Sequence, residues 1–179
     1  MSNPVNEAEF LEKHAPMAYN LALRLTGNPT EAEDLAQDAL IRALKGLKDF
    51  KGDSQTATWL YRIVVNTWKN RVRYEKRRGF WKTVSMSFFT GEDQDEEPNF
   101  KSDEAPLDAP LESDERANAV QKALLELDED SRAILVLREL KDQSYGQIAE
   151  ALGLPEGTVK SRLSRARDAL KEKLKKFAA

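Results

Sequence analysis

The sequence of 179 residues contains no cysteine and only one histidine, His14. Without cysteine the chain has no disulfide scaffold, no zinc finger and no thiol nucleophile. A single histidine gives little support to a His-based catalytic triad or to a metal site with several imidazole ligands. An active site built on carboxylates would need paired acids in a pocket, whereas the acids here gather in one stretch and on helix exteriors. We therefore expect a protein that is not an enzyme and that binds no metal or cofactor.

The sequence also lacks a long apolar segment. Its longest unbroken run of aliphatic side chains, Ala133 to Leu137, is far shorter than the roughly 20 residues that a membrane span needs. No basic segment followed by an apolar one opens the chain, as a secretory signal would. We expect a cytoplasmic protein without a membrane span.

Charges of opposite sign are distributed unevenly, although the net charge is only −3. Residues 1–82 hold 14 basic and 10 acidic residues, residues 83–118 hold 2 and 11, and residues 119–179 hold 12 and 10. The middle stretch contains three prolines and no apolar periodicity, which is typical of a flexible, self-repelling linker. The pattern predicts two small helical domains, 1–82 and 119–179, joined by a flexible acidic linker at 83–118.

Apolar residues recur at helical spacing through the N-terminal part. The spacing predicts a helix over 10–25, a second helix capped by Thr30, and a third from about Thr58 to Tyr74 or beyond. No segment alternates with a period of two for long enough to form a sheet, so the predicted fold is all-α. The expected buried stripe of the second helix consists of Ala32, Leu35, Ala36, Ala39, Leu40, Ala43, Leu44 and Leu47.

The third predicted helix has an apolar face and a basic face. At 100° per residue, Leu60, Ile63, Val64, Thr67 and Trp68 share the apolar face. The opposite face combines cations that suit phosphates, amides that suit base edges and an aromatic ring for stacking. A solvated helix face would carry the same charges, and each tryptophan would fit a core at least as well. The candidate nucleic-acid-binding residues are Trp59, Arg62, Asn66, Lys69, Asn70 and Arg73.

The C-terminal part begins with an amphipathic helix predicted over 131–140, with Leu140 on its apolar side. Ser144 and Gln147 then form a capping box that opens a short helix. That helix ends at the sequence Gly153-Leu154-Pro155, and a long, Arg-rich helix follows.

Two helices joined by a short glycine-containing turn, the second of them basic, are typical of a DNA-binding helix-turn-helix. The alternative is a helical hairpin with a solvated basic face. Serine and arginine on the outer face suit base edges, and the flanking cations suit phosphates. These candidates are Lys160, Ser161, Arg162, Ser164, Arg165 and Arg167.

Three blocks, in this order, resemble the extracytoplasmic-function sigma factors of bacterial RNA polymerase. The block LTGNPTEAEDLAQDALIRAL, from Leu25, is similar to the segment that docks on the clamp helices of the polymerase β′ subunit. The block FKGDSQTATWLYRIVVNTWKN, from Phe50, resembles the region that melts and reads the minus-10 promoter element. The block LRELKDQSYGQIAEALGLPEGTVKSRLSRAR, from Leu137, resembles the region that reads the minus-35 element. With the acidic stretch, the resemblance covers nearly the whole chain.

The resemblance implies roles for individual residues. It implies that core polymerase is bound by Asp34, Gln37 and Asp38. It implies that Asn66 lies near a flipped minus-10 base, which the loop 51–56 surrounds. On the minus-35 side it implies base reading by Ser161, Ser164 and Arg165, and phosphate contacts by Lys160, Arg162 and Arg167. The chain departs from the family at 55–57, where Gln-Thr-Ala replaces a frequent aromatic residue, so the preferred minus-10 sequence stays open.

The predicted function is that of a sigma factor, a promoter-specificity subunit without catalysis of its own. It would bring core RNA polymerase to promoter DNA and promote opening of the duplex. The resemblance further implies an anti-sigma factor as a partner, although no motif identifies it. The alternative is a stand-alone helix-turn-helix regulator, which would have no need of the exposed acidic and amide residues at 34–38.

Overall fold

The computed structural model of the protein describes residues 7–47, 50, 55–89 and 111–176. Every regular element within these residues is a helix, so the all-α prediction is confirmed. The N-terminal elements are α1 (Glu7–Thr26), α2 (Pro29–Leu47) and α3 (Thr56–Phe89). The C-terminal elements are α4 (Leu111–Leu125), α5 (Glu129–Leu135), the π-helical turn η1 (Val136–Leu140), α6 (Tyr145–Leu152) and α7 (Glu156–Lys175). In the described ranges no helix has the length and apolar character to cross a membrane.

The first two helices pair around a tight turn at Gly27, whose φ of +71° is accessible to glycine without Cβ strain. Asn28, rather than the expected Thr30, caps α2, because its Oδ1 accepts the N–H of Glu31 at 3.1 Å. Pro29 suits the first helical position, since it lacks only an N–H that would have had no partner there. The predicted stripe of α2 is buried, with its one half-buried member at Leu44.

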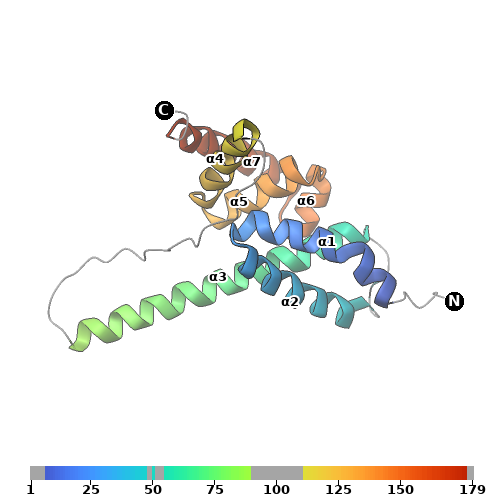
Figure 1. The fold of residues 1–179 in the computed structure, drawn as a ribbon, viewed down its shortest axis with the longest axis horizontal. Coiled ribbons are helices and arrows are strands. Elements are labelled where there is room, and N and C mark those ends of the chain that lie inside the picture. Colours follow the sequence, from blue (N-terminus) through green and yellow to red (C-terminus); the bar gives the residue numbers. More distant parts are fainter. Residues whose placement is uncertain (1–6, 48–49, 51–54, 90–110, 177–179) are drawn as a thin grey trace.

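Helix α3 packs on α1 and α2 and then continues well beyond them (Figure 1). Its predicted apolar face is buried, with Ile63 half-buried. The helix runs to Phe89, and α4 begins at Leu111, so both ends of the expected linker at 83–118 are helical. Residues 90–110 of that linker lie outside the described residues, and the three-part division of the chain stays a prediction.

The helix expected over 131–140 is α-helical only as far as Leu135 and widens into η1. This change of helix type explains why Leu140, expected on the apolar side, is 43% exposed, whereas all five residues from Ala133 to Leu137 are buried. Asp142 ends the segment in a left-handed conformation at φ 49°, and the N–H of Gln143 donates back to the carbonyl of Leu137 at 3.0 Å.

The predicted helix-turn-helix is formed by α6 and α7. The capping box at its start is present, since Ser144 and Gln147 exchange side chain–backbone hydrogen bonds of 3.2 and 2.8 Å. Gly153 adopts the left-handed conformation at the end of α6, and α7 presents Val159, Leu163 and Ala166 to the interior.

The N-terminal and C-terminal helices dock against each other, which the sequence did not predict. Helix α6 lies beside the start of α3, where Thr58 Oγ1 donates to Gln143 Oε1 and Gln147 Nε2 donates to Gln55 Oε1, both at 3.2 Å. Figure 1 shows α4–α7 seated on one side of α1–α3. The buried apolar residues of both halves belong to one continuous cluster.

Candidate functional site

The outer face of α2 carries the residues expected to bind core polymerase. Asp34 and Gln37 are exposed, and Ile41, one turn further along the same face, is 50% exposed. The opposite face of α2 is buried, so this helix is held rigidly while it presents a mixed polar and apolar surface.

Asp38 lies at the edge of this face and pairs with a residue of α3. The Nη2 of Arg71 forms an ion pair with the Asp38 carboxylate and donates to the backbone carbonyl of Asp34 at 2.9 Å. Arg71 therefore holds the orientation of Asp38 and ties the candidate docking face of α2 to α3.

Four of the six nucleic-acid candidates on α3 are exposed: Arg62, Asn66, Asn70 and Arg73. Within the described part of the chain, none of their side chains makes a hydrogen bond or an ion pair. Unpaired cations and amides on one helix face are available to phosphates and base edges without breaking an existing contact. Lys69 differs, because its side chain is only 17% exposed and pairs with Asp130 of the C-terminal half.

The two tryptophans of α3 occupy different environments. Trp68 is buried, with the Arg132 guanidinium 5.4 Å from its ring centroid. Trp59 is half-buried, and its ring lies 4.8 Å from that of Phe50 and 6.4 Å from that of Phe10. A Cβ on Gly46 would approach the Trp59 ring to 3.2 Å, so this ring is packed from several sides.

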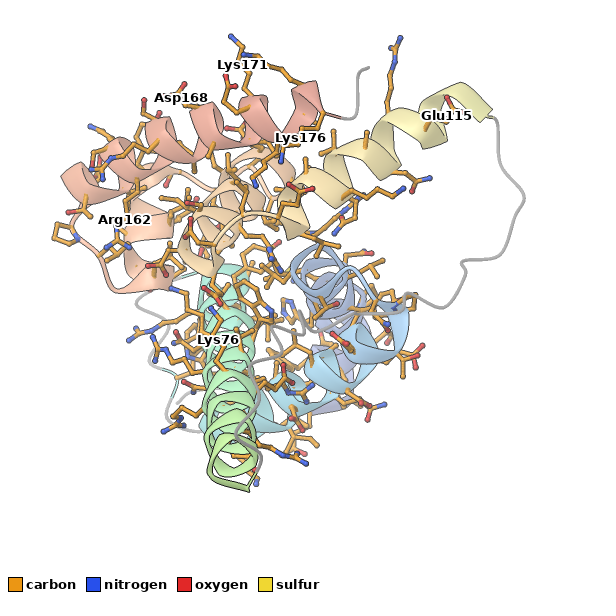
Figure 2. All side chains as sticks on the ribbon, turned by 90° about the vertical axis from the view of Figure 1, so that its left-hand side faces the viewer. Lys76, Glu115, Arg162, Asp168, Lys171 and Lys176 are labelled. Atoms are coloured by element: carbon orange, nitrogen blue, oxygen red, sulfur yellow. The ribbon has the colours of Figure 1, made fainter. Side chains whose placement is uncertain are left out.

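The candidate base-reading residues on α7 are exposed, whereas its three flanking cations are paired with acids. Ser164 and Arg165 have no side-chain partner among the described residues, and Ser161 Oγ donates to the carbonyl of Thr158 at 3.1 Å. Figure 2 shows that Asp168 and Lys171 of α7 point away from the N-terminal helices. The outer face of α7 is therefore open to solvent.

Each of the three flanking cations has an acidic partner. Lys160 lies 3.5 Å from Glu156 and 5.6 Å from the Tyr145 ring centroid, so it is bound only loosely. Arg167 donates twice to Glu139 Oε1, at 2.6 and 2.9 Å, and these bonds raise the pKa of its guanidinium. Arg162 pairs with Asp130 at 2.9 Å.

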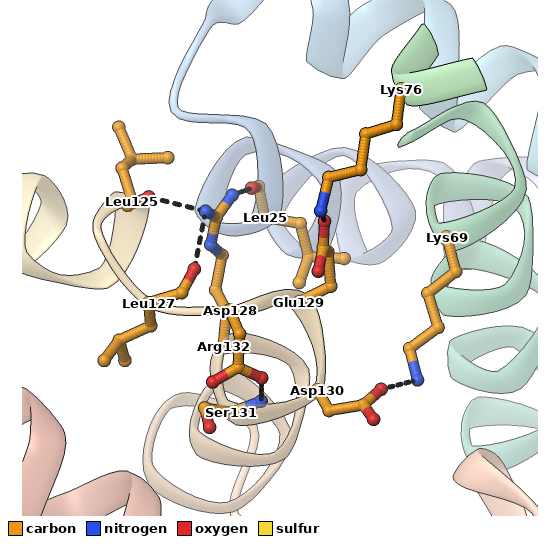
Figure 3. Close-up of polar contacts among 10 residues, drawn as sticks. All are labelled: Leu25, Lys69, Lys76, Leu125, Leu127, Asp128, Glu129, Asp130, Ser131 and Arg132. Carbon is orange, nitrogen blue, oxygen red and sulfur yellow. Dashed lines mark hydrogen bonds and ion pairs between the residues drawn. The ribbon is translucent and has the colours of Figure 1, made fainter. Parts of the chain in front are cut away.

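Three consecutive acids, Asp128, Glu129 and Asp130, stand at the start of α5 between α3 and α7 (Figure 3). Asp128 caps α5 by accepting the N–H of Ser131 at 2.9 Å. The hydrogen bond from Lys76 lowers the pKa of Glu129 below its usual range, and that from Lys69 does the same for the pKa of Asp130. Both carboxylates are therefore ionised near neutral pH.

Arg132 holds the turn between α4 and α5 and joins it to α1. Its Nε and Nη2 donate to the carbonyls of Leu124, Leu125 and Leu127 at 2.9, 2.6 and 3.1 Å. Its Nη1 crosses to the carbonyl of Leu25 in α1 at 2.8 Å (Figure 3). Burial lowers the pKa of this guanidinium from its ordinary value, although the side chain stays charged.

Sequence reasoning missed four residues of these surfaces. Ile41 and the 57% exposed Tyr74 continue the candidate faces of α2 and α3 by one helical turn each, and helical spacing alone would have found them. Arg71 and Asp130 act through partners more than 30 residues away in sequence, so no local pattern indicated them. Among the described residues, no group of three or more His, Asp or Glu side chains could hold a metal ion.

Comparison with known protein families gives two matches, to sigma-70 region 2 over residues 10–78 and to sigma-70 region 4 over residues 117–170. The chain is 38% identical over 165 residues to the RNA polymerase sigma-H factor of Pseudomonas aeruginosa, covering 90% of this chain and 82% of that one. It is 39% identical over 150 residues to the ECF RNA polymerase sigma-E factor of Escherichia coli K12, covering 80% and 74%. The chain belongs to the ECF sigma factors. As such it directs RNA polymerase to promoters and is not an enzyme.

Solved structures agree with this assignment. The sigma factor RpoE of Bartonella quintana, in complex with the anti-sigma factor NepR, is 30% identical, with a TM-score of 0.67, and the match covers 94% of this sigma factor and 96% of that chain. CnrH, in complex with the cytosolic domain of CnrY, shares the fold at a TM-score of 0.64. In this sigma factor, region 2 thus corresponds to α1, α2 and most of α3, and region 4 to α4–α7.

Proposed function

We propose that this sigma factor divides its task among three helices: α2 docks on core polymerase, α3 binds the minus-10 element and α7 reads the minus-35 element. The observation that carries this proposal is that each helix is buried on one face and presents exposed candidates on the other. Among the described residues, the candidates whose side chains have no partner are Asp34, Gln37, Arg62, Asn66, Asn70, Arg73, Ser164 and Arg165. These side chains can bind a partner without first breaking contacts of their own.

On α2, the clamp helices of the β′ subunit would meet Asp34, Gln37 and Ile41, with Asp38 at the edge. An apolar side chain among polar ones is a common anchor at the centre of a protein interface. Arg71 keeps Asp38 in place for this contact.

On α3, Asn66 and Asn70 would bind bases of the opened non-template strand, while Arg62, Lys69 and Arg73 would bind its phosphates. Trp59 supports the start of this surface by packing, because its ring is enclosed by Phe10 and Phe50. The loop expected to surround a flipped base includes 51–54, which lie outside the described residues. Promotion of duplex opening follows from capture of an unstacked base, which offsets the few kcal/mol that unstacking costs.

On α7, Ser161, Ser164 and Arg165 would contact base edges in the major groove, and Lys160, Arg162 and Arg167 would contact phosphates. A stand-alone helix-turn-helix regulator would use the same helix, but the match of region 2 to residues 10–78 favours the sigma factor. We further infer that the protein acts in the cytoplasm, where RNA polymerase works. We also infer an anti-sigma factor as a partner, since the relative from Bartonella quintana was solved with one.

The test is run-off transcription with core polymerase on a library of genomic fragments, which measures function and promoter sequence together. Asp34→Lys should abolish run-off transcription, because it reverses the charge of an exposed docking residue. In gel filtration the variant should no longer co-elute with core polymerase. Glu33→Lys is the matched control: it makes the same charge change at an exposed position on the same helix, about 100° around the axis. Equal activity of the two variants would contradict the assignment of α2.

A further inference from the structure

The outer face of α3 carries an aromatic ring that is open to solvent. Tyr74 is 57% exposed, and among the described residues it makes no hydrogen bond and no ring contact. Trp59, the aromatic residue that the sequence suggested for stacking, is enclosed by Phe10 and Phe50 instead. An exposed aromatic side chain on a rigid helix offers a free π face to a ligand.

Helical spacing places Tyr74 in line with the proposed base-binding residues. Asn66, Asn70 and Tyr74 follow one another at intervals of four residues, so they form one ridge along the helix. Arg73 and Arg77 form the neighbouring ridge at the same interval, and both lie within one helical turn of Tyr74. All five side chains are exposed. A ridge of two amides and a ring therefore runs beside a ridge of cations.

The charge along this face of α3 is almost entirely positive. Residues 62–78 contain seven basic residues and one acidic residue, Glu75. Glu75 acts on α2 instead, since burial, and then the negative charge of Glu75, raise the pKa of the Glu31 carboxyl. Three of the cations are held by acids of other helices: Lys69, Arg71 and Lys76. Arg73 and Arg77 have no acidic partner in the described part of the chain, so phosphates can bind them without displacing one.

This combination of groups suits an unpaired DNA strand. In a duplex the faces of the bases are stacked on one another, and a side chain reaches them only after unstacking. An unpaired strand offers base faces and phosphates together, and every base has a π face on which an aromatic ring can stack. The docking face of α2 differs in charge, because it presents Asp34 where this face presents arginines.

From these observations we propose that Tyr74 stacks on an unpaired base of the opened non-template strand, while Arg73 and Arg77 bind the phosphates on either side of that nucleotide. The proposal rests on the proposed role of α3 in binding the minus-10 element. The path of the strand then runs from Asn66 to Arg77, about 16 Å along the helix axis. Because stacking tolerates any base, Tyr74 favours opened DNA over duplex DNA and adds no base preference.

The test is binding of the full chain to a fluorescein-labelled deoxythymidine 12-mer, either single-stranded or paired with a deoxyadenosine 12-mer. Tyr74→Ala should weaken binding to the single strand about fivefold to 100-fold, the loss expected for one stacked base. Binding to the duplex should change by less than about twofold, because paired bases offer no free face. Tyr74→Phe should restore the affinity, whereas Tyr74→Leu, which has no π face, should not. Alanine has the higher helix propensity at this exposed position, so the variant keeps its fold.

Arg77→Gln separates phosphate binding from stacking. It should weaken binding to both probes and reduce the slope of log affinity against log salt concentration, by about 0.7 on the single strand and about 0.9 on the duplex. Tyr74→Ala removes no charge and should leave both slopes unchanged. Leu140→Ala is the control, because it truncates a 43% exposed apolar side chain of region 4 and should leave both affinities unchanged.

Equal losses on single strand and duplex in Tyr74→Ala would overturn the proposal, and so would a failure of Tyr74→Phe to restore the affinity. Absence of single-strand binding by the unmodified chain would also overturn it. Unchanged strand affinity in Tyr74→Ala together with lost co-elution with core polymerase would assign the ring to the docking surface of α2 instead. The oligonucleotides require neither polymerase nor a known promoter: the expected pattern without run-off transcription would support the stacking and refute the proposed function.

Discussion

Replacement of Arg132 by alanine tests how much stability one half-buried guanidinium supplies. Four carbonyls would each lose a donor, although that of Leu124 keeps the Leu127 N–H at 3.1 Å, and the Trp68 ring would lose the cation 5.4 Å from its centroid. A partly buried acceptor left without a donor costs about 1–3 kcal/mol, and a cation–π contact is worth about 0.5–2 kcal/mol. Water can reach part of this site, and the guanidinium no longer has to be desolvated, so the upper sum will not be reached. We expect a loss of about 2–4 kcal/mol in the free energy of unfolding.

The measurement is urea unfolding, followed by far-UV circular dichroism and by tryptophan fluorescence. Arg132→Lys keeps the charge but replaces the planar fork of three nitrogens by one ammonium nitrogen that cannot reach all four carbonyls, and should lose at least half as much as Arg132→Ala. Arg116→Ala, at an exposed position of α4, should stay within about 0.5 kcal/mol, because alanine and arginine have similar helix propensities. A loss below about 0.5 kcal/mol for Arg132→Ala would show that the four hydrogen bonds are replaced by water, and the reasoning would be refuted.

Two substitutions on the proposed DNA-binding surfaces, one at the turn between α1 and α2, and one pH dependence can be measured. Asn66→Ala should leave duplex binding nearly intact and reduce open-complex formation, with partial rescue on a premelted template; equal defects on both templates would contradict a role in melting. Arg165→Ala should weaken binding to the matched minus-35 duplex by about 1–3 kcal/mol and relax preference at one or two positions, whereas a loss that is uniform across promoter variants would point to a phosphate contact. Gly27→Ala should destabilise the protein by about 1–2 kcal/mol, the cost of the left-handed conformation for an L-residue, and by little more, because the atom 2.6 Å from its Cβ is Leu125 Cδ1, the end of a 37% exposed side chain that can turn away; if adding Leu125→Ala recovered most of the loss, the contact and not the backbone would set the cost. Burial, and to a smaller extent the charge of Lys13, lower the pKa of His14 below 6.5. The unfolded chain therefore takes up this proton at a higher pH than the folded protein, and the free energy of unfolding should fall as the pH drops below about 6.5. A His14→Leu variant should lack this part of the decline.

The sequence predicted those features of the fold that depend on residues close together in the chain. The buried stripe of α2, the capping box at Ser144 and the turn at Gly153 each depend on residues within a few positions of one another. The exposed positions of Asn66 and Arg165 follow from the same helical periodicity. Their nucleic-acid contacts were predicted from the same helix faces, and the family resemblance assigned them to the minus-10 and minus-35 elements.

Contacts between distant residues were not predictable in this way. Nothing near Asp130 in sequence indicates that Lys69 and Arg162 will share its carboxylate, since those partners are 61 and 32 positions away. The exposure of Leu140 was mispredicted because helical periodicity assumes 3.6 residues per turn, and η1 departs from it. The position of α6 against α3 depends on amide and hydroxyl contacts that carry no periodic signal.

The π-helical turn η1 lies between the buried helix α5 and the helix-turn-helix formed by α6 and α7. A π turn holds one residue more than an α-helical turn. If 136–140 closed as ordinary α-helix without losing a residue, the surplus residue would rotate everything after it by up to about 100° relative to Ala133–Leu135. The direction in which Arg165 meets a groove would change, although no residue at the DNA would have been altered. If α7 reads the minus-35 element as proposed, we expect promoter preference to depend on the helix geometry at 136–140 as well as on the side chains of α7.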